Sequence, residues 1–212
     1  MKTRGHKDRI IAHVEENKTI YLFTTVLFLI GIVFGAIIVN SLNLTQKNDL
    51  YMYLSQFFVQ VQDGRIAGSK EIFSQSYAHY GKYFALMWIL GLSLIGLPII
   101  LVLLFLKGVV VGFTVGFLVN QMGFQGFLLA MVSVLPQNLL LVPAFIIVGT
   151  ASVSFCLKML RQQFAKKVYQ PVFPQFLRYT LLLLCMGAAL SVAAAFEAYV
   201  SPYLLRMVVG FI

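Results

Sequence analysis

The strongest constraint on this chain is a run of fifty residues, Gly108 to Leu157, that contains no Asp, Glu, Lys, Arg or His. Three further charge-free blocks accompany it: Thr19–Gln46, Tyr83–Leu106 and Tyr179–Phe196. A helix needs roughly 20 mainly apolar residues to cross the ~30 Å hydrocarbon core of a bilayer. Since 60% of the residues are hydrophobic and only 11% are charged, we expect a single all-α polytopic membrane domain over residues 1–212.

The net charge of +9 would also suit a nucleic-acid-binding protein, but the distribution of the basic residues indicates another cause. They cluster in segment 1–18 and in segment 158–178, each of which lies beside a charge-free block. Basic clusters that flank transmembrane helices mark the cytoplasmic side of a membrane protein. We therefore expect both segments to be cytoplasmic, and we expect no nucleic-acid partner.

The sequence predicts about five transmembrane helices. The fifty-residue run has to supply two of them, because a single crossing would leave segment 158–178 on the outer side. The polar, glycine-bearing stretch 121–126 is the suitable turn between them. The five expected spans are Ile20–Asn40, Tyr83–Leu106, Gly108–Asn120, Phe127–Leu157 and Tyr179–Phe196. Gly96 and Pro98 interrupt the second span, and Pro98 removes one backbone donor.

This topology places the N-terminus in the cytoplasm and the C-terminus outside. Eleven of the sixteen Lys and Arg residues then face the cytoplasm, with Lys107 at the short turn between the second and third spans. The apolar tail Ser201–Ile212 is too short to cross, and we expect it to form an interfacial helix on the outer side. The first span exceeds the ~7–15 apolar residues of a signal peptide, so we expect it to remain as an anchor.

The outer loop, residues 41–82, contains a predicted amphipathic helix. Its apolar residues recur at helical spacing among Gln and Asn residues, which is typical of a helix that lies at the membrane surface. A second helix is expected to begin at about Ser69 and to run into the second span. The apolar stripe has two possible roles, an interfacial anchor or lid on the bundle, and a surface for docking a partner. Its members are Leu50, Leu54, Phe57, Phe58 and Val61.

Glycines at spacings of four residues predict close helix packing. Gly31 and Gly35 form one such pair in the first span, and Gly108, Gly112 and Gly116 form a double repeat in the third. Small residues at this spacing let two helix backbones approach each other in a membrane. The pattern fits packing within the chain and equally a homo-oligomer interface.

The fourth span carries a break at Pro136, Gln137 and Asn138, with Pro143 further on. Pro136 removes one backbone donor, and the two amide side chains could satisfy the carbonyl that it frees or link helices. A kink with side-chain repair is one interpretation. A transport or partner site is the other, because broken helices hold the substrates of many transporters.

The sequence shows no pattern typical of an intramembrane enzyme. Its histidines, His6, His13 and His79, all lie outside the apolar blocks, and no HExxH or paired intramembrane Asp occurs. Glu197 is the only ionisable candidate near a span, and it lies at an outer end. We therefore expect no catalytic residue, no metal site and no cofactor.

Several longer motifs resemble the stage II sporulation protein M family of endospore-forming bacteria. They are GLPIILVLLFLKGVVVGFTVGFLVNQMG at 96–123, LPQN at 135–138, MLRQQ at 159–163, VNS at 39–41 and FSQS at 73–76. The wider family often carries Pro-His-Gly-x-x-Glu-x-Pro in its fourth span. Here the prolines remain as Pro136 and Pro143, while Gln137, Asn138 and Leu141 replace His, Gly and Glu. This departure favours a scaffold over a transporter.

The resemblance implies a membrane scaffold on the mother-cell side of the sporulation septum. Such a protein recruits and holds two peptidoglycan-degrading partners, the stage II sporulation proteins D and P, which thin the septal wall during engulfment of the forespore. It implies no hydrolase activity for the chain itself. The alternative function is a small-solute transporter or channel-like subunit that acts through the broken fourth span.

Overall fold

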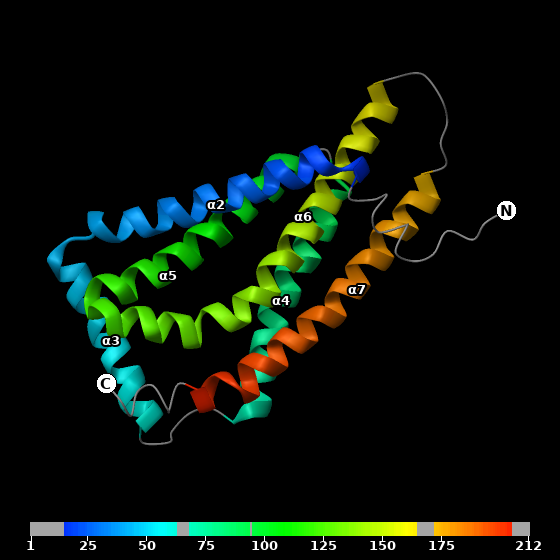
Figure 1. Cartoon of the computed structure of the whole chain (residues 1–212). Coiled ribbons are helices and arrows are strands. Elements are labelled where there is room, and N and C mark those ends of the chain that lie inside the picture. Colours follow the sequence, from blue (N-terminus) through cyan, green and yellow to red (C-terminus); the bar gives the residue numbers. More distant parts are fainter. Residues whose placement is uncertain (1–14, 63–67, 94, 165–171, 205–212) are drawn as a thin grey trace.

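The computed structural model describes residues 15–62, 68–93, 95–164 and 172–204 of the chain (Figure 1). These residues form helices and contain no β-strand. The helices are α2 (Lys18–Ser41), α3 (Leu44–Gln62), α4 (Ser69–Gly91), α5 (Gly96–Ser133), α6 (Leu135–Phe164) and α7 (Val172–Tyr199).

Four helices are long and apolar enough to cross a membrane. They are Lys18–Ser41, Gly96–Ser133, Leu135–Gln162 and Phe173–Leu204. The prediction of an all-α polytopic membrane protein is therefore confirmed. The helix α4 is not among the helices that are long and apolar enough to cross. It contains only the first part of the expected second span, and it begins with a polar stretch from Ser69 that contains Lys70 and Glu71.

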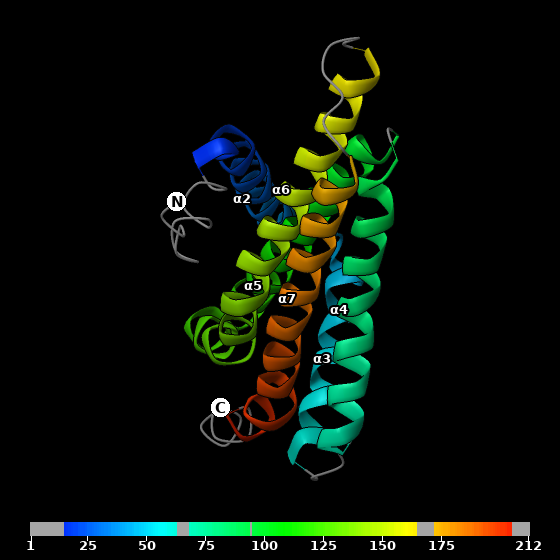
Figure 2. The same ribbon diagram turned by 90° about the vertical axis from the view of Figure 1, so that its right-hand side faces the viewer.

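The helices form two groups that meet at one end of the molecule (Figures 1 and 2). In one group α2 lies along α5, and in the other α4, α6 and α7 lie side by side. The groups are joined near the start of α2, where the hydroxyls of Thr24 and Thr150 are 2.9 Å apart. The helix α3 runs from the far end of α2 towards the start of α4 (Figure 1).

The predicted second span, Tyr83–Leu106, is not a single crossing helix, and its expected interruption at Gly96 is a turn between two helices. The helix α4 ends at Gly91, and α5 begins at Gly96 after a tight turn in which the Gly96 amide donates to the Ser93 carbonyl (3.0 Å). A Cβ atom at Gly96 would overlap the carbonyl of Leu90, so only glycine fits this turn. Pro98 then lies in the first turn of α5, where a missing amide hydrogen has no cost.

The predicted third span, Gly108–Asn120, begins too late in the sequence. The first arm of α5 (96–122) starts twelve residues earlier and carries Lys107 in its interior, so Lys107 is not at a cytoplasmic turn. The chain reverses at Gly123, whose φ of 59° lies in the left-handed region that favours glycine. This reversal falls within the expected turn at 121–126.

The second arm of α5 (124–133) returns beside the first arm. A Cβ atom at Gly126 would overlap the carbonyl of Leu118, which shows how closely the arms approach. The predicted fourth span, Phe127–Leu157, runs from the second arm of α5 into α6. Val134 between them keeps helical dihedral angles (φ −95°, ψ −41°), and its amide donates to the Ala130 carbonyl (2.9 Å). The last predicted span, Tyr179–Phe196, lies inside α7.

The helix α6 is the centre of the bundle. Its residues from Val148 to Cys156 are all buried, and every second side chain from Thr150 is small and polar. Each polar group has a partner on another element. The Thr150 hydroxyl meets Thr24, the Ser152 hydroxyl lies 2.8 Å from that of Tyr179, and Ser154 donates to the Asn17 side chain (2.5 Å). These bonds join α6 to α2, to Asn17 directly before α2, and to α7.

The contact between α2 and α5 is made by backbone against backbone. The five predicted packing glycines all lie in it, and it is a contact within one chain. A Cβ atom at Gly108 would overlap the Phe28 carbonyl, and one at Gly112 would overlap the Ile32 carbonyl. At Gly116 it would lie 3.0 Å from the Cα of Ala36.

The substitution Gly112→Leu tests this contact. We expect it to destabilise the protein by more than the ~1–3 kcal/mol of ordinary overpacking, because the side chain would meet rigid backbone. Val110→Leu is the matched control, since Val110 is 58% exposed on the same helix. Thermal unfolding in detergent and membrane abundance measure the effect. Equal melting temperatures for the two variants would contradict the close contact.

Candidate functional site

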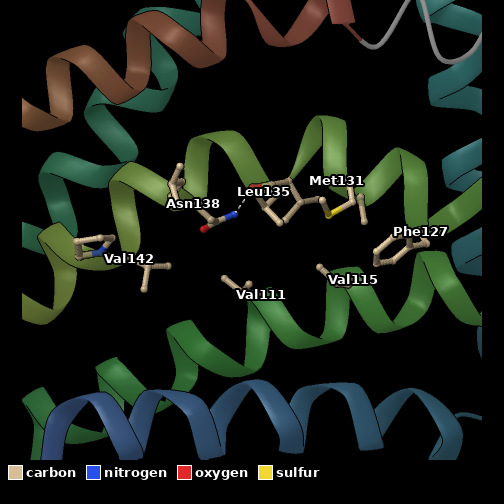
Figure 3. A pocket seen from close by; sticks show the side chains of 11 residues that line it. Val111, Val115, Phe127, Met131, Leu135, Asn138 and Val142 are labelled. Carbon is tan, nitrogen blue, oxygen red and sulfur yellow. Dashed lines mark hydrogen bonds between the residues drawn. The ribbon is translucent and has the colours of Figure 1, made fainter. Parts of the chain in front are cut away.

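The broken fourth span borders an apolar cavity of about 410 Å³ (Figure 3). The cavity lies between the first arm of α5, the second arm of α5 and the first turns of α6. Its lining residues are Val111, Val115, Phe127, Ala130, Met131, Val134, Leu135, Asn138, Leu139, Val142 and Pro143. Asn138 has the only amide among these side chains, and none is charged. The lining therefore suits an apolar guest such as an acyl chain and offers little to a polar solute.

Asn138 does not satisfy the carbonyl that Pro136 frees, which is that of Val132, four residues earlier. Its side-chain amide donates to the Val134 carbonyl (2.8 Å), as the dashed line in Figure 3 shows. That carbonyl already accepts the Asn138 backbone amide (3.2 Å). The Oδ1 atom of Asn138 is buried and has no hydrogen-bond partner among the residues that the structure describes. Pro136 lies in the first turn of α6, where its missing donor is tolerated, while Pro143 lies inside the helix.

The four residues of the predicted broken-helix site do not converge. Asn138 and Pro143 line the apolar cavity, whereas Gln137 lines a second cavity of about 310 Å³ together with Phe57 and Phe113. Pro136 lines neither.

The apolar stripe of α3 is divided between two environments. Leu54 packs against a cluster formed by Leu118, Leu129 and Ala130 of α5, so it faces the bundle. Phe57 borders the second cavity but remains 44% exposed, and Leu50 is half-buried. The side chains of Phe58 and Val61 lie outside the described set. The exposed face of α3 carries other large residues, namely Tyr51, Met52, Tyr53 and Val59.

A polar cluster inside the bundle was missed by the sequence analysis. The ammonium of Lys107, in the first arm of α5, lies 5.2 Å from the ring centroid of Tyr80 and 5.2 Å from that of Phe145. The Tyr80 hydroxyl donates to the Glu197 carboxylate (3.0 Å). The Lys107 ammonium and the Glu197 carboxylate therefore both contact Tyr80, the first at its ring and the second at its hydroxyl. Three helices, α4, α5 and α7, thus place one cation, one phenol and one anion together around Phe145 of α6.

A signal for this cluster was present in the sequence. Lys107 is the only charged residue between Lys82 and Lys158, and Glu197 is the only acidic residue after Glu71. A second span that ends at Leu106, as the sequence predicts, would place Lys107 at a turn between two spans. Because α5 begins at Gly96, Lys107 lies roughly 16 Å along a candidate membrane span, at a rise of ~1.5 Å per residue.

Other clusters of chemically active side chains do not occur in the parts of the chain that the structure covers. No three His, Cys, Asp or Glu side chains come together there in a way that could hold a metal ion. The Ser152 hydroxyl bonds to Tyr179 and to the Val148 carbonyl, so its contacts resemble those of a helix-packing residue.

The comparison with protein families identifies the chain. The model of stage II sporulation protein M matches residues 24–202. The chain belongs to this family. No curated protein and no solved structure matched it. The family match includes the whole of α3, both cavities and the Lys107–Glu197 cluster, so each of these features lies within the family's shared region.

The substitution Asn138→Leu tests whether the side chain of Asn138 is needed to stabilise the interrupted helix. The substitution removes a buried acceptor atom that has no partner, and such an atom lowers the stability of the folded protein by ~1–3 kcal/mol. It also removes one hydrogen bond, which is worth only ~0.6 kcal/mol on average in a membrane. We expect the variant to melt at or above the wild-type temperature in detergent. Asn138→Asp is the control that keeps the shape and adds charge, and it should melt lower. A clear loss of stability in Asn138→Leu would show instead that the hydrogen bond to the Val134 carbonyl is needed to hold the helix.

Proposed function

We propose that this protein is a membrane scaffold of the sporulation septum. It recruits and holds peptidoglycan-degrading enzymes, the stage II sporulation proteins D and P, for septal wall thinning and engulfment of the forespore. The family match supports a role in sporulation. The observation that carries the scaffold role is α3, a helix outside the four candidate spans that exposes large residues, including Tyr51, Tyr53 and Phe57.

The exposed face of α3 has the composition of a protein interface. Aromatic residues and Met are enriched in interfaces, and a few of them supply most of the binding energy. The inner face of α3 is anchored through Leu54, so the helix is held on the bundle while its other side remains accessible. We therefore place the partner surface on the side of α3 that carries Tyr53, with Phe57 at its edge beside the second cavity.

The proposed orientation follows from the charge distribution. Segments 1–18 and 158–178 are on the cytoplasmic side, and α3 with the C-terminal tail is on the outer side, where peptidoglycan lies. The ion pair between Lys158 and Glu16 (2.9 Å) joins these two segments at the same end of the bundle, which is consistent with a shared side. The protein would then belong to the mother-cell membrane.

The chain itself has no enzymatic role in this proposal. The wall-degrading chemistry belongs to the partners, and the scaffold requires no cofactor or metal. A bound membrane lipid fits the apolar cavity beside Val111 and Val115. Homo-oligomerisation would need a surface other than the glycine contact, because α2 and α5 of one chain already occupy it.

A second candidate function is a small-solute transporter or channel-like subunit. The Lys107–Glu197 cluster favours it, because ionisable residues inside a membrane often mark a transport pathway. The cavities at the broken helix argue against it, since their lining carries no charge. Solute uptake into proteoliposomes separates the two candidates.

Cysteine labelling tests the orientation. In a background with Cys156→Ala and Cys185→Ala, we expect Lys47→Cys and Lys70→Cys to react with an impermeant maleimide in intact cells. Arg161→Cys and Lys166→Cys should react only after the membrane is opened. Reaction of either of the last two variants in intact cells would reverse the proposed topology.

Substitutions on α3 test partner docking. Tyr53→Ala combined with Phe57→Ala should weaken capture of proteins D and P about tenfold or more, because each aromatic anchor of an interface contributes on the order of 2 kcal/mol. Engulfment should fail while the membrane abundance of the scaffold stays normal. Leu29→Ala with Phe23→Ala is the control, since these side chains are equally large and exposed but lie on α2. Undiminished capture by the α3 variant would place the docking surface elsewhere.

A further inference from the structure

The two ionisable residues of the Lys107–Glu197 cluster are each isolated in the sequence. Between Lys82 and Lys158 there is no charge other than Lys107, and no acidic residue except Glu197 follows Glu71. Ninety residues separate the two, and they lie in α5 and at the end of α7. The fold nevertheless brings the lone cation of one long segment to the lone anion of another.

The geometry connects the two charges through Tyr80. Only 7% of the Tyr80 side chain is exposed, its ring lies under the Lys107 ammonium, and its hydroxyl donates to the Glu197 carboxylate. Phe145, which is fully buried, supplies a second ring at the same distance from the ammonium. The rings stabilise the cation by cation–π attraction, and the phenol hydroxyl stabilises the anion by a charge-assisted hydrogen bond.

Each charge would be costly in the bilayer without the other. A lone Lys or Glu at membrane depth needs a partner charge, a water-filled cavity or a route to the interface. Neither residue lines any of the cavities described for this protein. Lys107 is synthesised well before Glu197, so its charge has no counter-ion until the last helix has entered the bundle.

We propose that Glu197 is the internal counter-ion of Lys107, and that this pair, joined by Tyr80, is the positioning contact that completes the membrane domain. It fixes the end of α7 and the middle of α4 against α5. Because α4 follows α3 in the chain, the same contact determines where the outer helix lies on the bundle. The pair has no part in moving a proton or a solute. This inference stands independently of the identity of the partners.

A double-mutant cycle tests the pair. Lys107 and Glu197 are both partly buried and are connected through Tyr80. Removing one of two opposite charges inside a bundle leaves the other uncompensated, while replacing both by neutral residues is often tolerated. We expect Lys107→Met and Glu197→Gln each to reduce membrane abundance about fivefold or more, and we expect the double variant to return to within about twofold of wild type. Tyr80→Phe keeps the ring and removes the hydroxyl, so it should lie between the single variants and wild type.

A surface ion pair provides the matched control. Lys158 and Glu16 are 2.9 Å apart, but their side chains are 40% and 63% exposed. Exposed pairs contribute little, so Lys158→Met should leave abundance and melting temperature almost unchanged. This control separates the loss of a buried counter-ion from the loss of any lysine.

Engulfment and capture of proteins D and P complete the test. The double variant should fold and support both, because no charge is needed once both are absent. Two results would overturn the inference. The double variant could remain as depleted as the worse single variant, which would show that the residues are not each other's counter-ions. It could also fold, capture its partners and still fail in engulfment, which would assign the charges to a proton or a solute. Failure of partner capture in the wild type would reject the docking proposal alone.

Discussion

The close parallel contact between α2 and α5 determines how the rest of the chain is arranged. Gly108 lies against Phe28, Gly112 against Ile32 and Gly116 against Ala36, so the contact advances in the same direction along both helices. Two parallel helices must be connected by a segment that returns along the bundle. The chain does this with α4, although its first half is polar. Its buried residues Tyr80, Phe84, Met87 and Gly91 follow helical spacing, which lets α4 pack on α6 and α7.

The interior of the bundle shows which contacts hold helices together when apolar side chains gain little by packing on each other in place of lipid. In a bilayer, lipid tails are as apolar as leucine, so helix packing depends on small residues and on hydrogen bonds between helices. The segment of α6 from Val148 to Cys156 combines both properties, and its hydroxyls bond to α2 and α7. The contacts of Tyr80 with the Lys107 ammonium and with the Glu197 carboxylate also connect α4, α5 and α7. The bundle is therefore held by a few specific polar contacts at different depths.

These features favour a rigid platform over a moving transporter. The glycine contact allows no room for side chains between α2 and α5, and the hydroxyls of α6 already have partners. The cavity at the broken helix is apolar, and Asn138 bonds to the carbonyl of Val134 beside the break. A scaffold that holds wall-degrading enzymes needs a stable outer surface, and α3 is presented on such a bundle.

The sequence by itself determined the membrane class, the glycine contact surface, the turn near Gly123 and the helix start at Ser69, and its motifs were enough to indicate the family. These features depend on local composition and spacing, which a single segment carries. It marked an interruption of the second span at Gly96 and Pro98 but did not reveal that the chain turns between Gly91 and Gly96, and it therefore misplaced Lys107. That turn depends on Gly91 approaching Tyr179 and on Gly96 approaching Leu90. Only the tertiary structure brought Lys107 to Glu197, because a pairing across ninety residues depends on how whole helices pack and leaves no periodic pattern in either one.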